Sequence, residues 1–289
     1  MKFRIIGLVV ALLSILLGAH PAKAKDVVMS GAERSDYFTQ ALSLALSYAP
    51  EKQYQIKFIN FDVPKLRALK LIANHEGIDV IPAGATVERQ ELVNPIRLPL
   101  LKGLFGWRVP LVLEKNKDMF LQKQTDVEFK QHIAGQLYTW SDTKILESNG
   151  IKVLKGSKFL GLFTMLEKER FDYFPRSMLE VEEEYQRFKH HGIIIEPNII
   201  LHYPTAYYFY VSKQNVELHN DIRNGLELAI ADGRLNTLFK QHFGDIITRI
   251  NLKNRRLIEL NNPFLPPDVP LSRKKLWLDV EQYIDNNVN

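Results

Sequence analysis

The chain has 289 residues, of which 46% are hydrophobic and 25% are charged, and it contains no cysteine. This composition is typical of a globular protein with one large or two modest domains. The lack of cysteine excludes disulfides, thiol chemistry and cysteine-ligated zinc, so a hydrophobic core has to supply the stability.

The formal net charge of +5 overstates how basic the protein is. Lys2, Arg4 and Lys23 lie in the first 24 residues, which contain no acid, so residues 25–289 carry 35 basic side chains against 33 acidic ones. The resulting charge of +2 is too small and too dispersed for a nucleic-acid-binding surface. We therefore expect no nucleic acid as a partner.

Residues 1–24 are predicted to be a secretory signal peptide. Lys2 and Arg4 form a basic start, residues 5–17 are apolar but short for a membrane span, and Ala22-Lys23-Ala24 fits a cleavage site. The alternative is an uncleaved anchor helix. No cysteine follows the cleavage site, so we expect an exported protein without a lipid anchor.

From residue 26 on, predicted strands and helices alternate, which indicates an α/β fold with mostly parallel sheets. Hydrophobic periodicity and capping residues place the elements. Strands are expected at 26–30, 54–60, 78–84, 107–115, 151–154, 171–174, 193–201 and 207–213. Helices are expected after Ser35, from Pro64 to Gly77, from Ser141, and at 157–169, 180–192, 221–233 and 234–244, with Ser177 opening the helix that follows the strand at 171–174.

The C-terminal region differs from the rest of the chain. Four prolines fall within residues 262–270, and proline cannot continue a helix. This stretch is therefore predicted to be an extended strap, followed by a last short helix over 276–284.

Three segments, in order, resemble the periplasmic solute-binding proteins of the amino-acid-binding type, family 3 of the bacterial extracellular binding proteins. They are "EGIDVIPAGATVERQELVNPIRLPLLKG" (76–103), "LFTMLEKERFDYFPRS" (162–177) and "YYFYVSKQNVELHNDIRNGLELAIADGRLNTLFKQHFGD" (207–245). The stretches "PLLKGLFGWR", "DYFPRS" and "NPFLPPDVPL" further resemble one branch of exported proteins of this type, for which the resemblance indicates the fold better than the ligand.

The resemblance implies the type II periplasmic-binding fold: two α/β lobes joined by two hinge strands, with the ligand in the cleft between them. On this reading residues 25–108 form the first part of lobe 1, 109–206 form lobe 2, and 207–250 return to lobe 1. Residues 251–289 are an addition, the C-terminal extended strap and short helix.

Arg89 is the first candidate that the resemblance implies for ligand binding. In the family this arginine pairs with the ligand carboxylate, which its planar guanidinium fits with two hydrogen bonds. The backbone N–H groups of Gly84 and Ala85 and the hydroxyl of Thr86 would bind the same carboxylate, since small residues let the backbone approach. The alternative is a solvated Arg89 at a helix start beside Glu88 and Glu91.

Arg176 and Ser177 are candidates from the second lobe. In amino-acid binders the loop after this strand carries an acid that grips the ligand's ammonium group, and here that place falls on Ser177, with Arg176 before it. An arginine from each lobe would then meet an acid that needs no ammonium, such as a dicarboxylate or a peptide-like anion. The alternative is that Arg176 forms an exposed pair with Glu180, one helical turn further on.

Aromatic residues are expected in the cleft walls, because ligand sites are mostly apolar with few polar anchors. Ser141 joins Trp140 at a helix start where the family has a ligand-contacting loop, whereas Asp79 and Asp172 are expected to cap strands. For Trp107 packing at the hinge is the alternative. The predicted aromatic contacts are Tyr37, Trp107, Trp140, Tyr173 and Tyr203.

The sequence therefore predicts a monomeric periplasmic binding protein rather than an enzyme. It would close on a small anionic or amino-acid-like ligand and deliver it to an inner-membrane transporter or sensor. We expect no catalytic residues and no cofactor, and the scattered histidines lack the spacing of a metal site. Two alternatives remain: a dehydratase-like enzyme acting on a cyclic acid with the same fold, and a docking or sensory module that uses the strap and Trp277.

Overall fold

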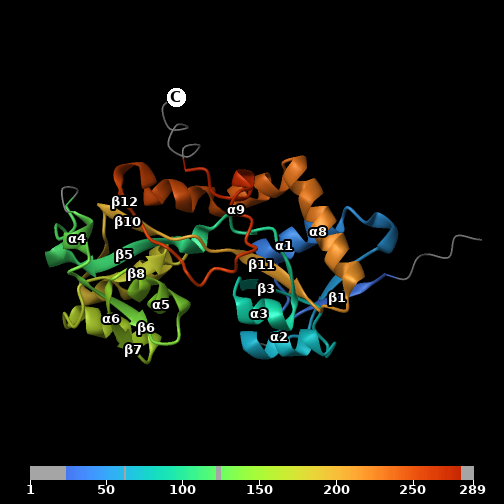
Figure 1. Cartoon of the computed structure of the whole chain (residues 1–289), viewed down its shortest axis with the longest axis horizontal. Coiled ribbons are helices and arrows are strands. Elements are labelled where there is room, and N and C mark those ends of the chain that lie inside the picture. The colour runs from blue at the N-terminus through green and yellow to red at the C-terminus, as the bar shows by residue number, and fades with distance from the viewer. Residues whose placement is uncertain (1–23, 62, 122–124, 281–289) are drawn as a thin grey trace, which may run out of the picture.

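The computed structural model describes residues 24–280 apart from 62 and 122–124, and it has two α/β lobes joined side by side (Figure 1). The predicted signal peptide lies outside the described residues except for Ala24. Within the described part of the chain no helix is both long and apolar enough to cross a membrane.

Lobe 1 contains a two-stranded sheet, β1-β2, beside a three-stranded sheet in the order β3-β11-β4. Its strands are β1 (Asp26–Met29), β2 (Gln55–Phe58), β3 (Val80–Gly84), β4 (Asn94–Ile96) and β11 (Tyr207–Val211). Asp79 connects β1 to β3: its N–H donates to the carbonyl of Val28 at 2.9 Å, and its carboxylate accepts the N–H of Val28 at 2.8 Å. This is the strand-capping role predicted for Asp79.

Helices cover both faces of the β3-β11-β4 sheet, because successive side chains of β11 point to opposite faces. Phe209 and Val211 pack with α1 (Tyr37–Leu46), α8 (Val216–Ala231) and α9 (Arg234–Ile250). Tyr208 and Tyr210 pack on the other face with α2 (Lys65–Ala73), next to α3 (Val87–Leu92).

Lobe 2 likewise contains a two-stranded sheet, β6-β7, beside a larger sheet in the order β12-β10-β5-β8, and an isolated parallel bridge between Ala134 and Tyr173 links the two. Its strands are β5 (Trp107–Leu113), β6 (Ile133–Leu137), β7 (Lys152–Gly156), β8 (Phe174–Ser177), β9 (Ile193–Ile195), β10 (Ile199–His202) and β12 (Arg256–Glu259), with β9 on the far end of β5. Its helices are α4 (Asp126–Phe129), α5 (Ser141–Ser148), α6 (Phe159–Glu167) and α7 (Val181–Phe188). Asp172 repeats the role of Asp79, since its carboxylate accepts the N–H of Ile133 at 2.6 Å.

The predicted mostly parallel sheets are wrong. Of the named strand pairs in the described chain, three are parallel and five are antiparallel. The antiparallel pairs all involve β5 or β11, which carry the chain between the lobes and so run against their neighbours.

The predicted strand at 171–174 is shifted, because the long β5 supplies partners further along. Phe174 lies opposite Leu111, Pro175 opposite Pro110, and Ser177 opposite Arg108. Pro110 and Pro175 both lack a backbone N–H, so placing them opposite each other leaves no hydrogen-bond donor unpaired in the sheet. The helix that was expected to open at Ser177 therefore begins at Val181.

Two predicted helices are longer in the structure, and one is capped by a different residue. α8 begins at Val216, where the Asn215 side chain accepts the N–H of Leu218 at 3.2 Å, and α9 continues to Ile250. The cap of α1 is Asp36 rather than Ser35, since the Asp36 carboxylate accepts the N–H of Thr39 at 2.8 Å.

The chain passes between the lobes twice, first between β4 and β5 and again between β10 and β11. These two crossings touch at Gly106. The N–H of Tyr203 donates to the Gly106 carbonyl at 3.2 Å, and a Cβ at position 106 would lie only 1.9 Å from the Tyr203 carbonyl oxygen. Only glycine lets the backbones of the crossings pass this closely.

The chain crosses a third time after α9. β12, which was not predicted from the sequence, pairs in parallel with β10 of lobe 2, and the segment after it returns to lobe 1 (red in Figure 1). Residues 262–270 contain no helix or strand, as predicted for the strap. In place of the start of the predicted helix over 276–284 there is one 3-10 turn, Lys274–Leu276, and residues 281–284 lie outside the described part.

Candidate ligand-binding cleft

A cavity of about 650 Å³ lies between the lobes, within the range of small-molecule sites. Both lobes, both crossings and the C-terminal segment contribute to its walls. They are lined by Lys65, Gly84, Ala85, Thr86, Arg89, Phe105, Arg108, Trp140, Ser141, Asp142, Ile145, Arg176, Glu180, Tyr203, Thr205, Ala206, Tyr207, Asn262, Phe264 and Leu265.

The lobe 1 wall carries two cations, Arg89 and Lys65. Thr86 caps α3, accepting the N–H of Arg89 at 3.3 Å, and thereby places Arg89 in the first turn of this helix. The guanidinium of Arg89 donates to the Gly84 carbonyl at 2.6 Å, and the ammonium of Lys65 donates to the Tyr207 hydroxyl at 2.6 Å. Neither forms an ion pair with any residue that the structure describes, so this wall is positive.

Gly84, Ala85 and Thr86 lie at the cleft, where the resemblance placed them. One predicted donor is already engaged, however. The N–H of Ala85 donates to the carbonyl of Ala206 at 2.8 Å, which attaches this loop to the second crossing. The role expected for the Ala85 N–H is therefore corrected: it positions the loop.

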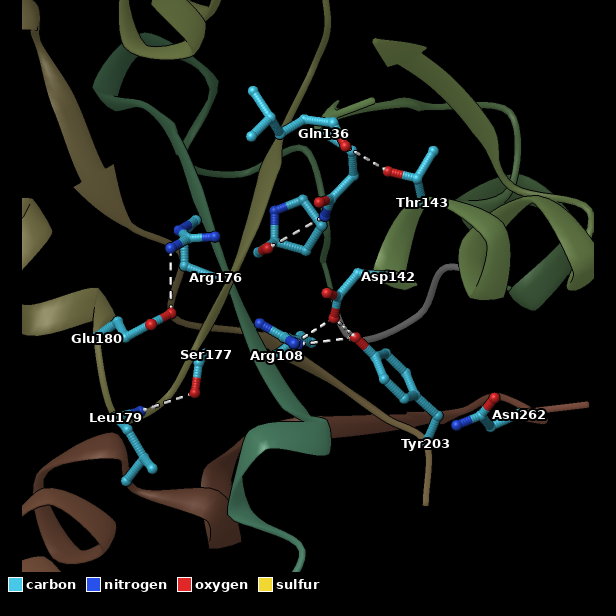
Figure 2. A network of polar contacts seen from close by, with 12 residues as sticks. Arg108, Gln136, Asp142, Thr143, Arg176, Ser177, Leu179, Glu180, Tyr203 and Asn262 are labelled. Atoms are coloured by element: carbon cyan, nitrogen blue, oxygen red, sulfur yellow. Dashed lines mark hydrogen bonds and ion pairs between the residues drawn. The ribbon is translucent and has the colours of Figure 1, made fainter. Parts of the chain in front are cut away.

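A buried network of three side chains forms the floor on the lobe 2 side (Figure 2). The Tyr203 hydroxyl accepts from Nε of Arg108 at 2.8 Å and donates to Oδ1 of Asp142. Nη2 of Arg108 pairs with the same Asp142 oxygen. The three residues come from the second crossing, β5 and the first turn of α5, so the network connects the hinge to lobe 2.

Burial shapes the charge of this network. It raises the pKa of Tyr203 well above its ordinary value, so the phenol stays a neutral donor. Burial also opposes the charge of Arg108, but Asp142 and Tyr203 more than compensate and raise the pKa of this guanidinium. The network therefore holds one positive and one negative charge, joined by a neutral hydroxyl.

Sequence reasoning missed Arg108 and Asp142. Asp142 directly follows the candidate Ser141 in the chain, and Arg108 lies within the apolar run "WRVPLVL". A single charged residue on a fully buried hinge strand is the signal that would have found it, since charges are buried only with partners.

Arg176 lines the cleft, but its guanidinium is already bound. Nε and Nη2 each lie 2.6 Å from an oxygen of Glu184, and Nη2 lies 3.1 Å from Glu180. The rings of Trp140 and Phe174 lie 4.5 and 5.0 Å from the guanidinium carbon, and only 6% of the side chain is exposed.

The predicted carboxylate-binding role of Arg176 is therefore corrected. The alternative, a pair with Glu180, is present, but it is buried and shared with Glu184. On this side of the cleft the lining bases Arg108 and Arg176 are matched by the lining acids Asp142 and Glu180, and Glu184 pairs with Arg176 without lining the cavity.

Ser177 is also not at the cleft. It is fully buried in β8, and its hydroxyl accepts the N–H of Leu179 at 3.3 Å. The position was misjudged because β8 continues through Ser177 instead of ending before it.

The predicted aromatic contacts divide into two groups. Trp140 and Tyr203 line the cavity, as does Ser141. Three others are core residues: Tyr37 donates to the Leu100 carbonyl at 2.5 Å, the ring of Trp107 packs against that of His202 with centroids 4.2 Å apart, and Tyr173 is fully buried. Trp107 thus has the hinge-packing role that was its alternative, and large aromatic area in a core explains all three.

The described part of the chain contains no group of three or more histidine, aspartate or glutamate side chains arranged to hold a metal ion.

No protein-family description and no curated sequence matches the chain. Several solved structures are similar to the chain. A probable amino-acid ABC transporter extracellular-binding protein from Bacillus subtilis superposes with a TM-score of 0.58 at 17% identity, over 77% of this chain and 99% of its own. A periplasmic His/Glu/Gln/Arg/opine family-binding protein from Silicibacter pomeroyi, solved with lysine, gives 0.53 at 11% identity over 76% and 97%.

An ancestral arginine-binding protein bound to arginine gives 0.50 at 19% identity, over 76% of this chain and 98% of its own. In all three comparisons the superposition covers nearly the whole of the matched protein and about three quarters of this chain. The chain therefore has the two-lobed type II periplasmic binding protein fold that these amino-acid-binding proteins share.

Proposed function

We propose that the protein is an exported solute-binding protein that closes on a small, amino-acid-like ligand bearing a carboxylate. The observation that carries this proposal is the charge arrangement across the cleft. Lys65 and Arg89 lie on the lobe 1 wall without an acidic partner among the described residues, whereas both arginines of the lobe 2 wall are paired, Arg108 with Asp142 and Arg176 with acids that include the cavity-lining Glu180. Closure would bring a ligand's carboxylate and its cationic group against complementary walls.

This arrangement changes the ligand class expected from the sequence. An anion without an ammonium group was expected because Arg176 was assigned a free positive charge. Glu184 and Glu180 match that charge, and the carboxylate of Glu180 itself lines the cavity. We assign to Glu180 the attraction of the ligand's ammonium, the role of the family's acid whose place in the sequence falls on Ser177.

Delivery to a membrane transporter is the second part of the proposal. It is supported by one of the structural neighbours, the Bacillus subtilis protein, which is a probable amino-acid ABC transporter extracellular-binding protein. None of the neighbours cited above is named as an enzyme. The Asp142 carboxylate accepts from both Arg108 and Tyr203, which suits a fixed acceptor better than a catalytic proton donor.

The test is calorimetric titration of the purified protein with amino acids, dicarboxylates and short peptides, followed by Arg89→Ala. If Arg89 grips a carboxylate in the closed cleft, its loss should weaken binding by about 2–4 kcal/mol, because the ligand's charge is left unpaired. Arg67→Ala is the matched control, since Arg67 is exposed on α2 and does not line the cleft. Equal affinities for the two variants would remove Arg89 from the site.

A further inference from the structure

The C-terminal segment is built into the cleft rather than lying beside it. We define the proline strap as residues 261–270. At its start the N–H of Leu260 donates to the His202 carbonyl at 2.8 Å, and Nδ2 of Asn262 donates to the Pro204 carbonyl at 2.9 Å. The strap therefore follows the second crossing across the mouth of the cleft, and Asn262 lies close to Tyr203 in Figure 2.

Both lobes hold the proline strap. On lobe 2, Asn149 at the end of α5 exchanges two hydrogen bonds with the backbone of Asn261, at 2.7 and 2.8 Å. On lobe 1, Asp268 accepts from Nε of Arg97 at 2.6 Å, and Leu265 and Val269 pack in the core cluster of α2 and β11. Because prolines fix φ and both ends are attached, the strap is ordered before any ligand arrives.

Phe264 is placed differently from the other apolar side chains of the strap. It lines the cavity, yet 50% of its surface is exposed. Leu265 and Phe105 line the same cavity, so an apolar surface shares it with the cations Lys65 and Arg89. An exposed aromatic ring on an ordered backbone can bury apolar ligand surface at little cost in conformational entropy.

We propose that the proline strap is a third wall of the ligand site, and that Phe264 selects ligands that carry an apolar body next to their carboxylate. This inference rests on the proposed function, because it needs a ligand held at the lobe 1 cations. It assigns the C-terminal addition to ligand recognition, in place of docking onto a partner protein.

The experiment titrates L-phenylalanine, L-leucine and L-alanine into the wild-type protein and into Phe264→Ala, Phe264→Tyr and Leu271→Ala. Phe264→Ala should weaken binding of phenylalanine and leucine about tenfold and that of alanine less than about twofold, because only the larger ligands reach the ring. Phe264→Tyr keeps the ring and should restore binding. Leu271 is 49% exposed just beyond the strap and outside the cleft, so Leu271→Ala should change nothing.

Three results would overturn the inference, and they have different meanings. If phenylalanine and leucine bind equally well to Phe264→Ala and wild type, while Arg89→Ala abolishes binding, the strap is no part of the site and the proposed function stands. If the protein binds alanine or aspartate but neither phenylalanine nor leucine, the strap inference also fails and the proposed function also stands. If the wild-type protein binds no amino acid, dicarboxylate or peptide, the proposed function fails and the strap proposal with it.

Discussion

Tyr203 shows how one hydroxyl can organise a binding cleft. It stands on the second crossing between Arg108 and Asp142, accepting from one and donating to the other. A buried ion pair is stable only when the remaining donors and acceptors are satisfied, and here the phenol does this. The network fixes the base of α5, which carries Trp140 and Ser141 to the cleft.

Replacing Tyr203 by phenylalanine should therefore destabilise the protein. The substitution keeps the ring but leaves Nε of Arg108 without its acceptor in a buried site, which costs about 1–3 kcal/mol. Urea unfolding measures the effect. Tyr138→Phe is the control, because Tyr138 is 62% exposed and should lose less than about 0.5 kcal/mol. An equal, small loss in both variants would mean that the hydroxyl of Tyr203 does not support the pair.

Arg176 shows that the role of a charged residue depends on partners that its local sequence does not reveal. Its place in the sequence, at the end of an aromatic strand and before a helix, suggested a charge offered to a ligand. In the structure Glu184, a residue eight positions further on, takes up that charge. The availability of an arginine thus depends on acids that only the fold brings near, which leaves Arg89 as the guanidinium assigned to the ligand.

At the scale of elements, the contact between α1 and α8 sets the shape of lobe 1. Gly225 lies on α8 where the backbone of α1 passes, and a Cβ there would be 1.9 Å from the carbonyl oxygen of Ala45. The two helices can therefore approach closely only because position 225 has no side chain. This contact lies in the continuous core that extends from lobe 1 through the hinge into lobe 2.

Gly225→Ala should cost about 3 kcal/mol of unfolding free energy, because two packed backbones have to separate. The matched control is Gly244→Ala. Gly244 lies inside α9 with no atom within 4 Å of its would-be Cβ, so alanine there should add about 0.5–1 kcal/mol through its better helix propensity. Denaturant unfolding of both variants measures these changes in unfolding free energy. Equal changes for the two variants would show that α1 and α8 can move apart to accommodate the extra methyl group.

At the scale of the whole molecule, the lobes are joined where β5 and β10 pair, and the ring of His202 packs against that of Trp107 there. Burial lowers the pKa of His202 from 6.5 to about 4. The unfolded chain therefore takes up a proton between pH 6.5 and 4 that the folded chain does not. Stability is complete above pH 6.5 and falls as the pH drops through this window.

Between pH 7 and pH 5 this single histidine should cost the protein about 2 kcal/mol of unfolding free energy. The measurement is the pH dependence of urea unfolding for the wild type and His202→Gln. The glutamine variant starts from its own, lower stability, but its loss on acidification should be smaller by that amount. Parallel pH profiles for the two proteins would contradict the assignment.

The sequence by itself determined the α/β class and most element positions, and its resemblance to amino-acid-binding periplasmic proteins implied the two lobes and the place of Arg89. The element positions are local or periodic properties: apolar alternation predicts strands, and caps and glycines bound helices. The loop from Gly84 to Arg89 is contiguous, so the resemblance could place it as one segment. The pairing of Asp79 and Asp172 with neighbouring strands was also readable, because each lies at the start of an apolar run.

Only the tertiary structure decided which charges are free and which aromatic rings face the cleft. The antiparallel pairing of β5 with β8 buried Ser177, and the core between α1 and α9 enclosed Tyr37. The fold also brought Arg108 to Asp142, 34 residues away, and placed Phe264 at a cavity whose other walls lie far earlier in the chain. Such contacts depend on strand register and long-range packing, which composition and periodicity do not contain.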